Sequence, residues 1–128
     1  MNIRKVVKHK NPAEKPKEIL PATFYKTAAD TEPVREWLKE FDREDRRTIG
    51  TDIRTVEYGW PVGMPVCKSL KKGLYEVRST ISGPREARVF FCIHKGQMVL
   101  LHAFIKKTQK TPKRELKLAR DRKWEIEQ

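Results

Sequence analysis

Basic side chains recur at the ends of three apolar segments in the C-terminal half of the chain. The segments YEVR, ARVFF and HAFIKK contribute Arg78, Arg88 and the adjacent pair Lys106 and Lys107. Two neighbouring cations repel each other and gain nothing by packing at the end of a strand, so they indicate a bound anion. A guanidinium can clamp two phosphate oxygens at once, which makes an RNA phosphate a good match for this set.

His102 and Glu76 are further titratable side chains in these segments. A lone histidine in an apolar strand is more often a hydrogen-bonded core residue than a catalytic one, but His102 remains a reserve candidate for the base or the acid. Glu76 could form an internal salt bridge with Arg78 or Arg88, although one carboxylate cannot neutralise several cations. We expect no metal and no cofactor, because no cluster with metal-ligand spacing and no glycine-rich phosphate loop is present.

Positive charge is concentrated towards the C-terminus. The 128 residues include 29 Lys and Arg and 17 Asp and Glu, a net charge of +12. Residues 68–128 hold 16 cations and 6 anions, whereas residues 21–67 hold 7 cations and 9 anions. The excess of positive charge indicates a polyanion partner, although ribosomal, membrane-surface and merely soluble basic proteins share it. Its segregation is what a phosphate-binding face would need. Further lysines near the strand ends are predicted to bind RNA: Lys68, Lys71, Lys72, Lys110 and Lys113.

Apolar spacing predicts two helices in the N-terminal half. After Thr31 as a cap, apolar residues recur at helical intervals through PVREWLKEF. A second stripe, formed by Ile49, Ile53 and Val56, follows a cap at Asp42 and ends at the GWP segment. The short connection predicts a helical hairpin that packs on one face of a sheet.

Strands are predicted on both sides of this hairpin. ATFYK, residues 22–26, is the first strand, and from Leu70 the apolar period changes to two. LYEV, ARVFFCI and QMVLLHAFI then predict a three-stranded antiparallel meander, and TPKRELKLARDRKWEIE a last helix capped by Thr111. The fold class is therefore α+β, with two N-terminal helices packed on a twisted antiparallel sheet and a C-terminal helix.

Strand alternation assigns the meander side chains to two faces. Counting along the last strand puts Val99, Leu101 and Ala103 on the face under the helical hairpin. The opposite face is predicted to receive the polar set of Glu76, Arg78, Arg88, His102 and Lys106.

The remaining features indicate the domain organisation, the state of the cysteines and the location of the protein. Residues 1–20 are lysine-rich and are predicted to form a basic arm, followed by one domain at residues 21–128. Cys67 and Cys92 are interpreted as reduced packing thiols. The N-terminus lacks the apolar core of a signal peptide and no apolar run has the length of a membrane span, so we expect a cytoplasmic protein without a membrane partner.

Several of these segments together resemble a known toxin family. GLYEVRS, REARVFF and VLLHAFIKKTQKTPKREL are similar to segments of the RelE/HigB-like toxins, in the phage-derived branch of that superfamily. FYKTAADTEPVREWL resembles the opening strand and first helix of the same branch, so the match covers roughly residues 22–122. The resemblance implies a RelE-like fold and a toxin of a type II toxin–antitoxin system that cuts mRNA in the ribosomal A site. Its partners would be mRNA, the ribosome with its rRNA, and a cognate helix-turn-helix antitoxin.

The resemblance also implies roles for individual residues. Arg88 matches the arginine that contacts the scissile phosphate, and Arg78 falls where members place a basic residue on the neighbouring strand. Lys106 and Lys107 match the basic pair that closes the last strand, and either is a candidate acid. Glu76 stands where some relatives have a catalytic lysine. The C-terminal His or Tyr that serves some members as acid or base has no clear match in RDRKWEIEQ.

Other interpretations use the same residues. A non-catalytic RNA-binding or ribosome-associated protein needs the same basic face without the chemistry, and the unmatched C-terminal His or Tyr favours it. KKTQKTPKRE taken alone is also typical of a solvated connector. A DNA-binding module ranks last, because no helix-turn-helix pattern is visible.

Overall fold

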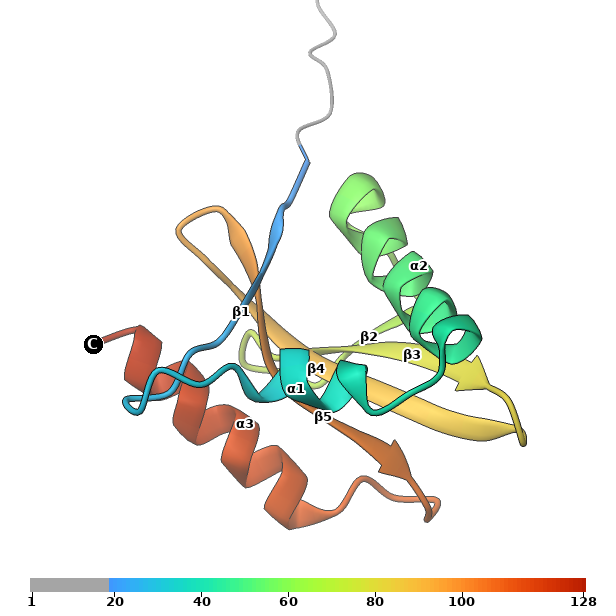
Figure 1. Ribbon diagram of the computed structural model, residues 1–128. Helices are drawn as coiled ribbons and strands as arrows, with labels where there is room; N and C mark the ends of the chain where they lie inside the picture. Colours follow the sequence, from blue (N-terminus) through green and yellow to red (C-terminus); the bar gives the residue numbers. More distant parts are fainter. Residues whose placement is uncertain (1–18) are drawn as a thin grey trace, which may run out of the picture.

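The computed structural model describes residues 19–128, in which helices cover both faces of a central sheet (Figure 1). The elements in chain order are β1 (Ala22–Phe24), α1 (Pro33–Lys39), α2 (Arg43–Gly59), β2 (Cys67–Ser69), β3 (Tyr75–Ile81), β4 (Arg85–His94), β5 (Gln97–Lys106) and α3 (Lys113–Ile126). The α+β class predicted from the sequence is confirmed. Most of the predicted basic arm at residues 1–20 lies outside the described residues. Its last residue, Leu20, is buried and donates its N–H to the Glu57 carbonyl oxygen at 2.8 Å.

The strands form one sheet in the order β1-β5-β4-β3-β2. Strands β3, β4 and β5 make the predicted antiparallel meander, and β2 adds an antiparallel edge strand that the sequence analysis missed. Strand β1 instead runs parallel to β5, pairing Ala22 with Met98 and Phe24 with Leu100. A parallel pair is possible here because both helices and most of the meander lie between the two strands in the chain. The predicted arrangement is therefore corrected in one respect, because the sheet is mixed rather than purely antiparallel. The strand predicted before the two helices, at residues 22–26, is present as β1.

Helices α1 and α2 cover one face of the sheet with the apolar stripes expected of them. Val34 of α1 and Ile49 and Val56 of α2 are buried in one cluster with Val89 and Phe91 of β4. Burial of a side chain of this size stabilises a fold by about 1.5–3 kcal/mol relative to leaving it exposed. This contact layer fixes the sheet and leaves its other face for a different set of side chains.

One of the three predicted helix N-caps is confirmed and two are displaced by one residue. Asp42 caps α2 as expected, because its carboxylate accepts the backbone N–H three residues later at 2.9 Å. The other two predicted caps are wrong by one residue. Helix α1 is capped at Glu32 rather than Thr31, and α3 at Pro112 rather than Thr111.

Helix α3 covers part of the opposite face and lies mainly against β5 and β4 (Figure 1). Its buried Ala119 packs in one cluster with Phe90 and Phe104. Arg122 donates to the carbonyl oxygen of Leu101 at 2.8 Å, so α3 is also tied to a strand backbone. The C-terminal helix thus divides this face into a covered part and a part that can hold polar groups.

Strands β4 and β5 lose their regular register at a β-bulge. Phe90 pairs with His102 whereas Phe91 pairs with Leu100, so Leu101 is an extra residue on β5. Leu101 is buried in the cluster on the α3 side, the same side on which His102 meets α3. The prediction that Val99 and Leu101 lie under the helical hairpin is therefore wrong, whereas Ala103 does lie there, because one inserted residue breaks the period of two.

Both cysteines are free and buried, which confirms their interpretation as packing thiols. Burial raises the pKa of the Cys67 thiol and of the Cys92 thiol to about 11 each. Both thiols therefore stay protonated at neutral pH, and neither has the thiolate character of an activated nucleophile.

Candidate functional site

Three adjacent strands bring basic side chains to the sheet face that α3 partly covers. Arg78 of β3 is the register partner of Arg88 of β4, and Lys106 of β5 is the register partner of Glu86. Phe90 lies two residues from Arg88 on the same strand and packs on the α3 side, so alternation places this whole set there. The structure thus brings together on one face the polar set of Glu76, Arg78, Arg88, His102 and Lys106.

Arg88 is buried in this face and paired with two carboxylates. Its side chain is 3% exposed, and its Nη1 donates to Glu86 Oε1 at 3.1 Å and to the Ala87 carbonyl oxygen at 3.0 Å. Its Nε lies 3.8 Å from Oε1 of Glu76, which is 2% exposed. Within residues 19–128, Nε of Arg88 and Oε1 of Glu76 have no hydrogen-bond partner. The internal salt bridge considered from the sequence is therefore present, with two carboxylates rather than one.

Arg78 extends from this cluster to the surface. Its Nε lies 3.8 Å from Oε2 of Glu76, and its side chain is 25% exposed. It lines a hollow of about 420 Å³ together with Thr80, Glu86 and the Met64–Val66 segment. Arg78 is therefore the more exposed member of the arginine pair, and Arg88 is the buried one.

Glu86 joins the buried arginine to the hollow. Its carboxylate accepts a hydrogen bond from the Thr80 hydroxyl at 2.9 Å as well as the bond from Arg88. The Thr80 hydrogen bond, followed by that of Arg88, holds the pKa of the Glu86 carboxyl below its ordinary value. Glu86 is thus a carboxylate that pairs with the Arg88 guanidinium and also lines the hollow beside Arg78.

His102 and Lys107 line a different hollow. Both contribute to a hollow of about 480 Å³ bounded by Trp37 of α1 and by Arg114 and Glu115 of α3. The imidazole Nε2 lies 2.5 Å from Oε1 of Glu115. The predicted catalytic residues therefore divide into an arginine cluster and a histidine hollow. Lys106 is half-buried at the end of β5, where it is the register partner of Glu86.

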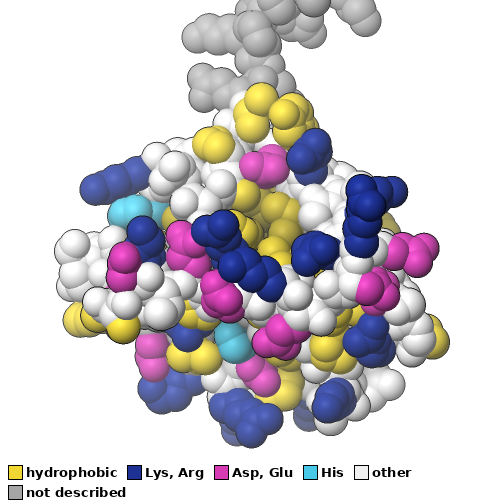
Figure 2. Space-filling model, in the orientation of Figure 1, with side chains coloured by type: hydrophobic (Ala, Val, Ile, Leu, Met, Phe, Trp, Pro, Cys, Tyr) yellow, Lys and Arg dark blue, Asp and Glu magenta, His cyan; other side chains and the backbone are white. Residues whose placement is uncertain are grey.

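The five lysines predicted to bind RNA are exposed and fall into two groups. Lys68 lies on β2 and Lys71 and Lys72 in the turn after it, whereas Lys110 and Lys113 lie before and at the start of α3. Lys71 and Lys72 have φ values of 76° and 54°, a left-handed conformation that is uncommon for residues other than glycine. Over the face in view, Lys and Arg side chains are interspersed with Asp and Glu rather than forming one continuous patch (Figure 2).

Sequence reasoning missed two carboxylates of these sites, Glu86 and Glu115. A signal for Glu86 was available, because it precedes Arg88 by two residues and strand alternation puts both side chains on one face. No local signal exists for Glu115. Its contact with His102 joins residues 13 apart and depends on the bulge at Leu101.

Two classes of site are absent from the part of the chain that the structure describes. Residues 19–128 contain no group of three or more His, Cys, Asp or Glu side chains placed to hold a metal ion. Within the same range, no helix combines the length and the apolar character needed to cross a bilayer.

The fold and this face define a class: a small α+β protein whose mixed sheet presents arginines and a lysine beside buried carboxylates. The chain belongs to the family described as Phage derived protein Gp49-like (DUF891), which matches residues 36–124. This family is of the RelE toxin-like type and is associated with the toxins of toxin–antitoxin systems, which confirms the phage-derived, toxin-like part of the resemblance. The match contains every residue of the two hollows discussed above. No curated protein matches the chain.

Proposed function

We propose that the chain is the toxin of a toxin–antitoxin pair and cuts mRNA in the ribosomal A site as a metal-independent endoribonuclease. The observation that carries the proposal is the register that aligns Arg78 with Arg88 and brings Lys106 to the same face. Cationic groups from adjacent strands suit the charge that develops on a phosphodiester as it reacts. Membership of a toxin-like family supports the same assignment.

The proposed reaction is an internal transesterification of the RNA. The ribose 2′-OH loses its proton and its oxygen attacks the adjacent phosphorus, the bond from phosphorus to the 5′-oxygen breaks, and that oxygen takes up a proton. The products carry a cyclic phosphate and a 5′-hydroxyl, with no change in oxidation state. In this scheme Arg88 and Arg78 hold the phosphate oxygens, and Lys107 or Lys106 donates the proton.

RNA binding then requires Arg88 to exchange one anion for another. Glu86 occupies Nη1 of Arg88, and the Glu86 side chain is 42% exposed, so it can turn into solvent. A phosphate that enters the hollow beside Arg78 can replace this carboxylate, because both anions accept hydrogen bonds from a guanidinium. The closed arrangement is therefore compatible with a site that opens when RNA arrives.

The proposal includes three partners. Messenger RNA and ribosomal RNA bind the basic face, and a cognate antitoxin with a helix-turn-helix domain neutralises the toxin in the cytoplasm. The neighbouring reading frame gives the simplest check of the last partner, since it should encode a short helix-turn-helix protein.

Reversing Lys68, Lys71 and Lys72 to glutamate is expected to weaken ribosome binding most strongly at low salt. Each lysine that neutralises a phosphate releases a counterion, so the slope of log affinity against log salt falls by about 0.7–0.9 per lost contact. The measurement is ribosome binding between about 50 and 200 mM salt. The matched control reverses three exposed arginines of α2, on the opposite layer: Arg46, Arg47 and Arg54. Equal slopes for the wild type and the lysine variant would remove these lysines from the RNA-binding surface.

The function is tested by adding the purified chain to ribosomes that carry a defined mRNA. We expect cuts at the A-site codon, with cyclic phosphate and 5′-hydroxyl ends. Ribosome binding with intact mRNA would instead identify a non-catalytic RNA-binding protein, an alternative that the sealing of Arg88 by Glu76 and Glu86 favours. Intact mRNA at saturating protein contradicts the proposal.

A further inference from the structure

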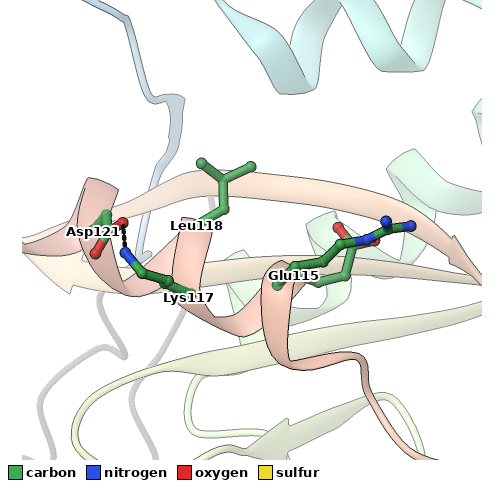
Figure 3. Close-up of a pocket in the computed structure, with 5 residues that line it drawn as sticks. Glu115, Lys117, Leu118 and Asp121 are labelled. Carbon is green, nitrogen blue, oxygen red and sulfur yellow. Dashed lines mark hydrogen bonds and ion pairs between the residues drawn. The ribbon is translucent and has the colours of Figure 1, made fainter.

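A histidine–carboxylate pair lies outside the arginine cluster, in the hollow between α1, β5 and α3. Nε2 of His102 and Oε1 of Glu115 are 2.5 Å apart, and their side chains are 15% and 16% exposed. This hollow adjoins a second one of about 520 Å³ along α3, because Arg114 and Glu115 line both. On that stretch of α3, Lys117 and Asp121 pair with each other, whereas Glu115 projects away from them (Figure 3). Glu115 is therefore the carboxylate of α3 that is available to the imidazole.

The β-bulge directs His102 towards α3. Because Leu101 is an extra residue, Leu101 and His102 lie on the same side of the sheet instead of on opposite sides. Phe104 stacks on the imidazole at 5.8 Å between ring centroids and 21° between planes, and Phe90 lies edge-on to it at 6.3 Å. Bulges are over-represented next to active sites, where they re-aim a side chain. The backbone and the two rings together fix where this imidazole points.

One carboxylate and two cations surround the imidazole. Oε1 of Glu115 contacts His102, and its Oε2 lies 3.8 Å from Nε of Arg114, whose side chain is 88% exposed. Lys107 lines the same hollow, and the residues that line it from β5 and α1 carry no further charge. The exposed cations favour entry of an anionic chain such as RNA, while the carboxylate is held by the histidine.

We infer that His102 is the general base of the proposed cleavage and that Glu115 is the residue that positions it. The inference rests on the proposed function and adds the group that takes the proton of the ribose 2′-OH. Because Glu115 holds Nε2, the other ring nitrogen, Nδ1, accepts that proton while the 2′-oxygen bonds to phosphorus. The bond to the 5′-oxygen breaks, and Lys106 or Lys107 protonates the leaving oxygen.

The sheet register places this base at a suitable distance from the arginine cluster. Arg88 is the register partner of Phe104, and His102 precedes Phe104 by two residues on the same face. Diagonal neighbours of this kind lie about 7–8 Å apart across a sheet. A nucleotide linkage can therefore contact Arg88 through its phosphate and His102 through its ribose. Glu115 then stabilises the imidazolium that forms, as a buried carboxylate does in a catalytic triad.

The test is the rate of ribosome-bound mRNA cleavage between about pH 5.5 and pH 8.5, a range that brackets an ordinary histidine. His102→Ala is expected to lose about a hundredfold or more in rate. Glu115→Gln is expected to lower kcat about tenfold with KM unchanged, because an amide cannot stabilise the imidazolium that forms in the transition state. The matched control is Asp121→Asn on the same helix, whose kcat should equal that of the wild type.

A purely structural role for the pair gives different results. Added imidazole should restore cleavage by His102→Ala at least about tenfold if His102 transfers a proton, whereas it cannot replace a helix anchor. If His102→Ala does not fold, Glu115→Gln decides alone, because it keeps the size and a hydrogen-bonding oxygen. A wild-type kcat for Glu115→Gln overturns the inference, while cleavage by the wild type upholds the proposed function. If the wild type does not cut mRNA, both the inference and the proposed function are wrong.

Discussion

Replacing Arg88 by alanine is expected to lower the rate of mRNA cleavage on the ribosome about a hundredfold or more. Removing one preorganised donor to a developing anion typically has this effect, equivalent to about 2.7–4 kcal/mol. Arg88 is the buried guanidinium at the centre of the polar face, with Arg78 opposite it on the next strand. Single-turnover cleavage of ribosome-bound mRNA measures the loss, and Arg88→Lys should recover only part of it because lysine lacks the planar fork.

Arg85 provides a matched control for this substitution. It lies on the same strand three residues earlier, but its guanidinium pairs with Asp45 of α2 at 2.9 Å and lies over the Phe41 ring. Arg85→Ala therefore removes the same group from the opposite side of the sheet and should leave cleavage per folded molecule unchanged. Circular dichroism of each variant gives the folded fraction. Wild-type cleavage by Arg88→Ala would exclude Arg88 from the reaction.

Replacing Glu76 by alanine is expected to lower the free energy of unfolding by about 3–5 kcal/mol. Glu76 and Arg88 are 2% and 3% exposed, and loss of one partner leaves the other charge buried with less compensation. The same substitution also removes the contact with Arg78. Urea unfolding of the chain measures the change, and a loss under about 1 kcal/mol would mean that the pair is solvated like a surface salt bridge.

A double substitution separates stability from function at this pair. Glu76→Leu with Arg88→Met replaces both charges by apolar side chains, which is often neutral or stabilising for a buried ion pair. We expect the double variant to unfold close to the wild-type urea concentration but to cut mRNA no faster than Arg88→Ala. A double variant as unstable as Glu76→Ala would indicate that the ion pair itself stabilises the fold. Glu76 Oε1 and Arg88 Nε lack hydrogen-bond partners within residues 19–128, so the pair is a poor device for stability alone.

The elements with strong local periodicity were predictable from the sequence. The stripes of α1 and α2, the cap at Asp42 and the meander of β3 to β5 all follow from spacing within one segment. The parallel pairing of β1 with β5 was not predictable, because it joins the first strand of the chain to the last strand of the meander and no local pattern reports it. The family match supports the toxin class and leaves individual residue roles as proposals.

The polar face was predicted in composition but not in its connections. Alternation put Arg78 and Arg88 on one face, yet it could not reveal that Glu76 and Glu86 seal Arg88. VLLHAF is apolar on both sides of its histidine, so the sequence carries no mark of the extra residue at Leu101. The contact between His102 and Glu115 depends on this bulge, so no local pattern in the sequence could report it.

The most direct measurement is a double-substitution cycle on the two aligned arginines. Single-turnover rates of ribosome-bound mRNA cleavage are compared for the wild type, Arg78→Ala, Arg88→Ala and the double variant. If both guanidinium groups hold one RNA phosphate, the double variant loses less than the product of the single losses, by about tenfold or 1.4 kcal/mol. Single losses that multiply without coupling, or singles that both cut at the wild-type rate, would show that Arg78 and Arg88 do not share a phosphate.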